Sequence, residues 1–247
     1  SRGATLRRFV SPVLHMREIL VADRVFARYE AGFMTYGIGW MIGWALLPLI
    51  VTDGLKMPYD AIANSAHVPG MVATVIITPL AGWLIDRKGA VRTCAASFAI
   101  YTFWPIGLLV ALLTNSQTNL VAASVVFGVA GALTNMGWML GPVALAPTPE
   151  KASQYVAIHS TLVGVRGGIF QFMGVGLYIL TGGFTAPLIV AALGFAWASW
   201  QMVALHRIMR ARDTTTPRPG AGEPSPTRPA PAPEPAETAQ AKAASPR

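Results

Sequence analysis

Six long apolar stretches, separated by short polar breaks, dominate the pattern of hydrophobic and polar positions along the chain. They lie near residues 30–52, 61–85, 93–113, 120–143, 154–180 and 184–206. Helices of this length, at 1.5 Å per residue, cross a hydrocarbon core of roughly 30 Å. The stretches are too long and too uniformly apolar for the strands of a barrel, the other structure that satisfies its backbone in lipid. The pattern therefore predicts an all-α, polytopic membrane protein with six transmembrane helices.

The composition agrees with a surface that faces lipid. Charged residues make up 12% of the chain and hydrophobic residues 53%, whereas roughly a quarter of the residues of a soluble domain are charged. The formal net charge of +8 would suggest nucleic acid on a soluble protein. Here the excess basic residues flank apolar runs, where they have a topological meaning. We therefore expect the lipid bilayer, and no nucleic acid, as a partner.

The basic residues at the span ends predict the orientation. If the N-terminus is cytoplasmic, that side holds six N-terminal arginines, three basic residues after the second span, one after the fourth and three after the sixth, thirteen in all. The loops on the other side hold only Lys56. This positive-inside bias predicts that both termini are cytoplasmic. The Ala-, Gly-, Arg- and Pro-rich composition is typical of a high-GC bacterium, and so we expect its inner (plasma) membrane.

Three regions follow along the chain. Residues 1–28 form a basic cytoplasmic lead-in or interdomain linker, in which apolar residues are interspersed with arginines, as in segments that lie on a membrane surface. Residues 29–212 form the six-helix domain. Residues 213–247 contain no Leu, Ile, Val, Phe, Met, Trp or Tyr but nine of the 19 prolines, which predicts a disordered cytoplasmic tail. The chain begins at Ser1, and both a fragment of a longer protein and a complete six-helix protein remain open.

The most specific local motif lies in the loop after the second span. Gly82, Asp86, Arg87 and Gly89 are spaced as in G-x-x-x-D-R-x-G, and Arg92 closes the loop. We expect Gly82 to permit close approach of a helix, and Asp86 to cap the next helix or pair with a basic side chain. Gly89 would permit a tight turn, and the two arginines would hold the loop at an anionic leaflet. The alternative is an ordinary tight loop rich in Gly, Asp and Arg.

This loop resembles the G-x-x-x-D-R-x-G-x-[RK] signature of the major facilitator superfamily, with the last basic residue one position later. The resemblance covers roughly residues 25–210 and implies half of a twelve-helix bundle. The basic lead-in and the tail favour the C-terminal half. It implies a secondary active transporter that moves a small molecule by alternating access, with this loop as a gate latch. The implied partner is a second six-helix half, upstream in the same chain or in another protomer. The alternative is a non-transporting six-helix subunit or scaffold of a larger membrane complex.

Arg166 is the first candidate for the substrate pathway, because charged groups deep in a span are costly and indicate function. It lies about 12 residues into the fifth span, near the midplane of the bilayer. His159 precedes it by seven residues and shares its helical face. We expect Arg166 to face a central cavity and to attract an anionic group, so that the substrate is an organic anion or an amphipathic metabolite. The alternative is a structural arginine that pairs with backbone carbonyls or with the second half.

Three further polar residues lie within spans: Asn64 and His67 in the second, and Asn135 in the fourth. Each is a secondary pathway candidate, and the alternative for each is an interhelical hydrogen bond. No carboxylate is expected deep in a span, because Glu30 and Asp53 lie at predicted span ends. If transport is proton-coupled, the carrier carboxylate then belongs to the missing half, or His159 carries the proton.

Other classes of function find little support in the sequence. There is no phosphate-binding loop, no His/Cys metal cluster and no well-placed Ser-His-Asp set. We therefore expect no enzymatic activity, no metal and no cofactor. The small-x-x-x-small pairs Gly39/Gly43, Gly137/Gly141 and Gly164/Gly168 indicate close helix packing and say nothing about a substrate.

Overall fold

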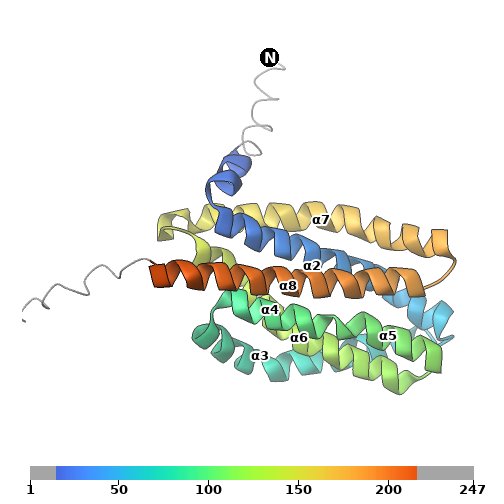
Figure 1. The fold of residues 1–247 in the computed structure, drawn as a ribbon. Helices are drawn as coiled ribbons and strands as arrows, with labels where there is room; N and C mark the ends of the chain where they lie inside the picture. Colours follow the sequence, from blue (N-terminus) through green and yellow to red (C-terminus); the bar gives the residue numbers. More distant parts are fainter. Residues whose placement is uncertain (1–14, 216–247) are drawn as a thin grey trace, which may run out of the picture.

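The structure, a computed structural model, describes the backbone of residues 15–215 and the side chains as far as residue 211. Within that range it is an up-and-down bundle of helices without strands (Figure 1). Six helical segments are long and apolar enough to cross a membrane: Arg24–Gly54, Ile62–Lys88, Ala90–Thr114, Gln117–Leu145, Pro149–Thr181 and Thr185–Ala211. The six predicted spans are confirmed, and the chain is an integral membrane protein.

Several spans are composed of more than one helical element. The elements in chain order are α2 (Arg24–Leu49), η1 (Ile50–Gly54), η2 (Ile62–His67), α3 (Val68–Lys88), α4 (Ala90–Tyr101), α5 (Phe103–Thr114), α6 (Gln117–Leu145), η3 (Pro149–Lys151), α7 (Ala152–Thr181) and α8 (Thr185–Thr215). The π-helical turns η1 and η2 end the first span and begin the second. The fourth, fifth and sixth spans correspond to α6, η3 with α7, and α8.

The first span begins earlier than the apolar pattern predicts. The Asp23 carboxylate accepts hydrogen bonds from the backbone N–H groups of Val25 and Phe26, both at 3.0 Å, and so caps α2. Glu30, expected at the span end, therefore lies in the second turn of α2, six residues after its first residue, Arg24. Residues 15–22 of the predicted lead-in are helical. Residues 1–14 and the predicted tail beyond residue 215 lie outside the described residues.

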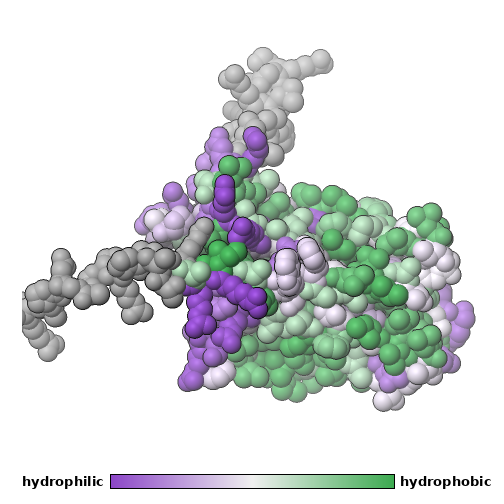
Figure 2. Space-filling model, viewed as in Figure 1, coloured by the Kyte–Doolittle hydropathy of each residue, from purple (hydrophilic) through white to green (hydrophobic). Residues whose placement is uncertain are grey.

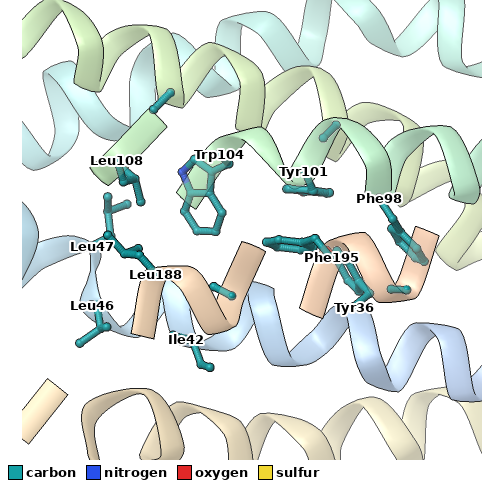
Figure 3. Packing of buried hydrophobic residues seen from close by; sticks show 14 of the residues in the cluster. Tyr36, Ile42, Leu46, Leu47, Phe98, Tyr101, Trp104, Leu108, Leu188 and Phe195 are labelled. Carbon is teal, nitrogen blue, oxygen red and sulfur yellow. The ribbon is translucent and has the colours of Figure 1, made fainter. Parts of the chain in front are cut away.

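Aromatic side chains fill the core between α2, α4, α5 and α8 (Figure 3). Tyr36 stacks on Phe98 with ring centroids 4.6 Å apart, and Tyr101 stacks on Phe195 at 5.0 Å. Trp104 is buried next to them. This packing makes α2 and α6 the most buried spans, with 56% of their apolar windows inside, against 22% for the α3 span and 11% for the α7 span. The surfaces of α3 and α7 are therefore the ones left most open.

The small-x-x-x-small pairs divide into two kinds. At four of these glycines, an added Cβ atom would lie under 3.0 Å from an atom of a neighbouring helix. The neighbour is α8 at Gly39, α5 at Gly43, α4 at Gly137 and α2 at Gly141. Close packing at these two pairs is confirmed. At Gly164 and Gly168 no described residue would lie within 4 Å of such an atom. The third pair thus has no packed neighbour in the described part of the chain.

The two ends of the bundle differ in charge. The α3–α4 and α6–α7 connections lie at the same end as the start of α2 and the end of α8 (Figure 1). Hydrophilic residues gather there, and the sides of the bundle are largely hydrophobic (Figure 2). The basic residues at this end include Arg87, Lys88, Arg92, Lys151 and Arg207. The structure therefore places on one side the residues that the positive-inside rule would assign to the cytoplasm.

Candidate functional site

A partly open cavity of about 450 Å³ lies where α2, α6 and α7 meet, with one lining residue each from α3 and α4. Its polar lining outside the aromatic residues consists of four side chains: Thr74, Thr134, Asn135 and Arg166. Six aromatic residues make up much of the remaining wall: Tyr36, Trp40, Trp44, Tyr101, Phe127 and Trp138. The structure thus brings two of the five pathway candidates, Arg166 and Asn135, to one cavity of the size that small-molecule sites have.

Arg166 lies near the middle of α7 and is only 5% exposed. Its Nη1 donates a hydrogen bond to the Phe33 carbonyl of α2. Its guanidinium carbon lies 5.2 Å from the centroid of the Tyr36 ring. Its Nε is buried and has no hydrogen-bond partner among the described residues. The hydrogen bond to a backbone carbonyl that is expected of a structural arginine is therefore present, but it uses one of the five N–H donors of the guanidinium. Arg166 makes no ion pair with any of the described residues.

Gly37 makes room for this guanidinium. A Cβ atom at residue 37 would overlap the Arg166 Cδ and would lie 2.7 Å from Nε. A side chain at this position would therefore push Arg166 away from α2 and from the carbonyl that it binds. No sequence pattern indicates this role, because Gly37 belongs to none of the small-residue pairs considered above.

We expect Gly37→Ala to lower the free energy of unfolding by about 1.5–3 kcal/mol, because the added Cβ displaces the Arg166 guanidinium from the Phe33 carbonyl and a hydrogen bond to a charged group contributes about this much. Gly176→Ala on α7, where an added Cβ meets no atom within 4 Å, is the matched control. Thermal unfolding in one lipid compares the two variants. A Gly37→Ala protein as stable as the control would show that Gly37 does not accommodate Arg166.

A second buried polar group, His159, lies seven residues before Arg166 on the same face of α7. His159 Nδ1 lies 2.9 Å from Oε1 and 3.0 Å from Oε2 of Glu30, and the two residues are 1% and 3% exposed. The imidazole packs at its edge against Phe33, with centroids 5.0 Å apart, and against the cavity residue Trp138 at 5.7 Å. His159 Nε2 is buried without a hydrogen-bond partner among the described residues. A carboxylate is therefore buried within the protein in the second turn of α2, nearer the start of the first span than its middle.

The register of two helices explains both contacts. Glu30 and Gly37 are seven residues apart on α2, and so are His159 and Arg166 on α7. Both helices run in the same direction through the bundle, so the two spacings match and each pair meets across one interface (Figure 1). The matching spacings were the available signal in the sequence. Among the described residues, no three His, Cys, Asp or Glu side chains are grouped so as to hold a metal ion.

The remaining pathway candidates lie farther from Arg166. His67 is half-buried, and its ring lies 5.0 Å from that of the cavity residue Trp44. Asn64 is exposed on η2 and does not line the cavity. In the described part of the chain, neither of these side chains nor that of Asn135 makes the interhelical hydrogen bond considered above. Such bonds come instead from small hydroxyl residues: Thr74 to Gly128, Ser97 to Ala130, Ser124 to Ala66 and Ser199 to Ala95.

The loop motif connects α3 and α4 through one residue, Gly89. Its φ of 77° lies in the left-handed region, which confirms the expected tight turn. The N-cap of α4 is Gly89 itself, without a side-chain hydrogen bond, so the prediction that Asp86 caps this helix is wrong. Asp86 is exposed and makes no ion pair among the described residues. An added Cβ at Gly82 meets nothing within 4 Å, so no helix of the described chain packs there.

The arginines of the motif lie at the basic end of the bundle. The Arg87 guanidinium carbon is 4.7 Å from the Trp83 ring centroid, a cation–π contact. Arg87 and Arg92 line a surface cavity of about 540 Å³ together with Lys88 and His206. This position suits contact with anionic headgroups or with another part of a transporter.

We expect Gly89→Ala to lower the free energy of unfolding by about 1–3 kcal/mol, because φ 77° with ψ 162° is a conformation that essentially only glycine adopts without strain. Gly82→Ala is the matched control, because it lies inside α3 with open space around an added Cβ. There alanine should stabilise the helix by up to about 1 kcal/mol. Thermal unfolding in one detergent compares the two variants, and equal midpoints would contradict the assignment.

Comparisons with known protein families and curated proteins found no match. The resemblance to the major facilitator superfamily therefore rests on the loop motif and stays a prediction.

Proposed function

We propose that this chain is one six-helix half of a secondary transporter that moves a small organic anion by alternating access. The observation that carries the proposal is Arg166, a buried cation whose Nε has no hydrogen-bond partner among the described residues, at the wall of a cavity between the spans. A buried charge without a partner is strongly destabilising, and the anionic group of a substrate would supply that partner. In this proposal Asn135 and the two threonines of the cavity bind the polar parts of the substrate.

A second six-helix half completes the cavity in this proposal, either from the same polypeptide or from another protomer. The surface of α7 supports it. Ser160, Gly164 and Gly168 are exposed at intervals of four residues, and so form one strip on the least buried span. Small residues of this kind are typical of contacts between helices in membranes. The loop motif is then a gate latch at the cytoplasmic face of a bacterial inner membrane, with both termini on that side.

The proton is the coupling ion in this proposal, and Glu30 with His159 carries it. The Glu30 carboxylate and the His159 imidazole lie at hydrogen-bond distance, so a proton can pass between them, and His159 shares its face of α7 with Arg166. Protonation of Glu30 would remove a negative charge near Arg166 and so strengthen its attraction for a substrate anion. The other ionisable groups nearby are Tyr29 and Tyr36 on α2, Tyr155 on α7 and Cys94 on α4.

The proposal is tested by reconstituting the purified chain in liposomes and measuring the uptake of labelled benzoate against an imposed pH gradient. Uptake above that of empty liposomes, driven by an acidic exterior, is the expected result. Binding to the chain in lipid nanodiscs, measured on monomeric and dimeric fractions, is the companion measurement. A chain that neither binds nor transports organic anions in any fraction would overturn the proposal and favour the alternative, a non-transporting subunit of a larger membrane complex.

A further inference from the structure

The wall of the cavity contains a continuous set of aromatic rings. Trp40 and Trp44 lie one turn apart on α2 and stack with their centroids 5.2 Å apart and their planes 10° from parallel. Trp44 also stacks on Phe127 of α6, at 5.5 Å and 24°. These three rings from two helices thus present flat apolar surface to one space. Aliphatic side chains would line an apolar cavity equally well, so burial of apolar area alone does not require stacked aromatic rings.

A second group of rings surrounds the charged end of the cavity. The Arg166 guanidinium lies over the ring of Tyr36. The ring of Tyr101 contacts that of Tyr36, with centroids 5.4 Å apart. Both tyrosines are held from behind by the core rings that Figure 3 shows, among them Phe195. Trp138 of α6 is 39% exposed and lines the same cavity. One cation is therefore set among rings whose positions are fixed by the core.

We propose that the substrate is a planar aromatic carboxylate, whose carboxylate binds Arg166 and whose ring packs against Trp40, Trp44 and Trp138. This inference rests on the proposed function and names its class of substrate. Aromatic rings gain from offset or edge contacts with one another beyond the burial of area. An aromatic cation is excluded by the charge of Arg166 in a low-dielectric site. A sugar carries no negative charge and would leave the buried Arg166 without an anionic partner, whereas a carboxylate would supply one.

The test compares ligands of equal size on the complete chain in nanodiscs by equilibrium dialysis. Benzoate should bind about tenfold more tightly than cyclohexanecarboxylate, which has the same charge but no aromatic ring. Benzylammonium, an aromatic cation, should show no measurable binding. Trp44→Leu should abolish the preference for benzoate and leave the affinity for cyclohexanecarboxylate within about twofold, since the ring contact is lost and the ion pair is kept. Trp138→Leu is a second variant of the same kind.

The matched control is Trp197→Leu, which removes an exposed tryptophan on α8 that does not line this cavity. It should leave the binding of both carboxylates unchanged. Equal affinities for benzoate and cyclohexanecarboxylate would overturn the aromatic substrate class and leave anion transport standing. Absence of binding by every anion would overturn the proposed function itself, and the inference with it.

Discussion

Replacement of Arg166 with glutamine is expected to lower the uptake of organic anions about 10- to 100-fold, since hydrogen bonds to a charged group contribute about 1.5–3 kcal/mol and each 1.4 kcal/mol is tenfold. Glutamine has no charge and ends two bonds short of Nη1, the atom that donates to the Phe33 carbonyl. The variant should therefore lose the charge that attracts the substrate together with this hydrogen bond, so stability has to be measured beside uptake. Initial rates of uptake into proteoliposomes measure the effect, and thermal unfolding in the same lipid measures the fold.

Arg166→Lys is the companion variant. Lysine keeps the charge but presents a point charge without the planar fork of the guanidinium, so an intermediate rate is expected. A purely structural arginine gives a different result, because Arg166→Gln would then unfold at a lower temperature while the folded fraction binds anions normally. Normal transport by Arg166→Gln, or by Arg166→Ala, would end the role of this residue in substrate binding.

Replacement of Glu30 with glutamine is expected to abolish the accumulation of substrate that is driven by a pH gradient, and to preserve the exchange of labelled for unlabelled substrate. Glutamine has the shape of the carboxylate but takes up no proton, so the cycle would lose its coupled proton. Exchange needs no net movement of protons and should continue. Uptake under an imposed pH gradient and counterflow at equal pH, on the same proteoliposomes, separate the two activities.

His159→Gln supplies the control for this pair. Removal of one partner of a buried hydrogen-bonded pair leaves the other polar group unsatisfied, which costs about 1–3 kcal/mol. The double variant Glu30→Gln with His159→Gln should therefore be less destabilised than the sum of the single variants, and thermal unfolding of all four proteins completes the cycle. Glu30→Gln protein that still accumulates substrate to the wild-type level would make the pair a structural one.

Among the polar residues, prediction from the sequence depended on how deep each lies in its span. Arg166 is surrounded by apolar residues on both sides, so its depth could be read from the sequence, although no sequence rule shows that its donors stay unmet. Polar and basic residues precede Glu30 and indicate a span end there, and only the cap at Asp23 shows where the helix begins. The role of Gly37 has no sequence signal, because a close approach depends on the side chain that arrives from α7.

The sequence by itself determined six spans, their alternating directions, the basic side of the bundle and a buried arginine in the fifth span. These features follow from the lipid environment, which requires about 20 apolar residues for each crossing and leaves basic residues at the ends. Only the tertiary structure decided that Glu30 meets His159, that Gly37 accommodates Arg166, and that aromatic residues from three helices line one cavity. The spans are apolar on nearly every side, so their periodicity does not show which side faces the protein. That choice is made by contacts between residues far apart in the chain, such as the hydroxyl groups and small residues that set how α2, α3, α4 and α6 pack.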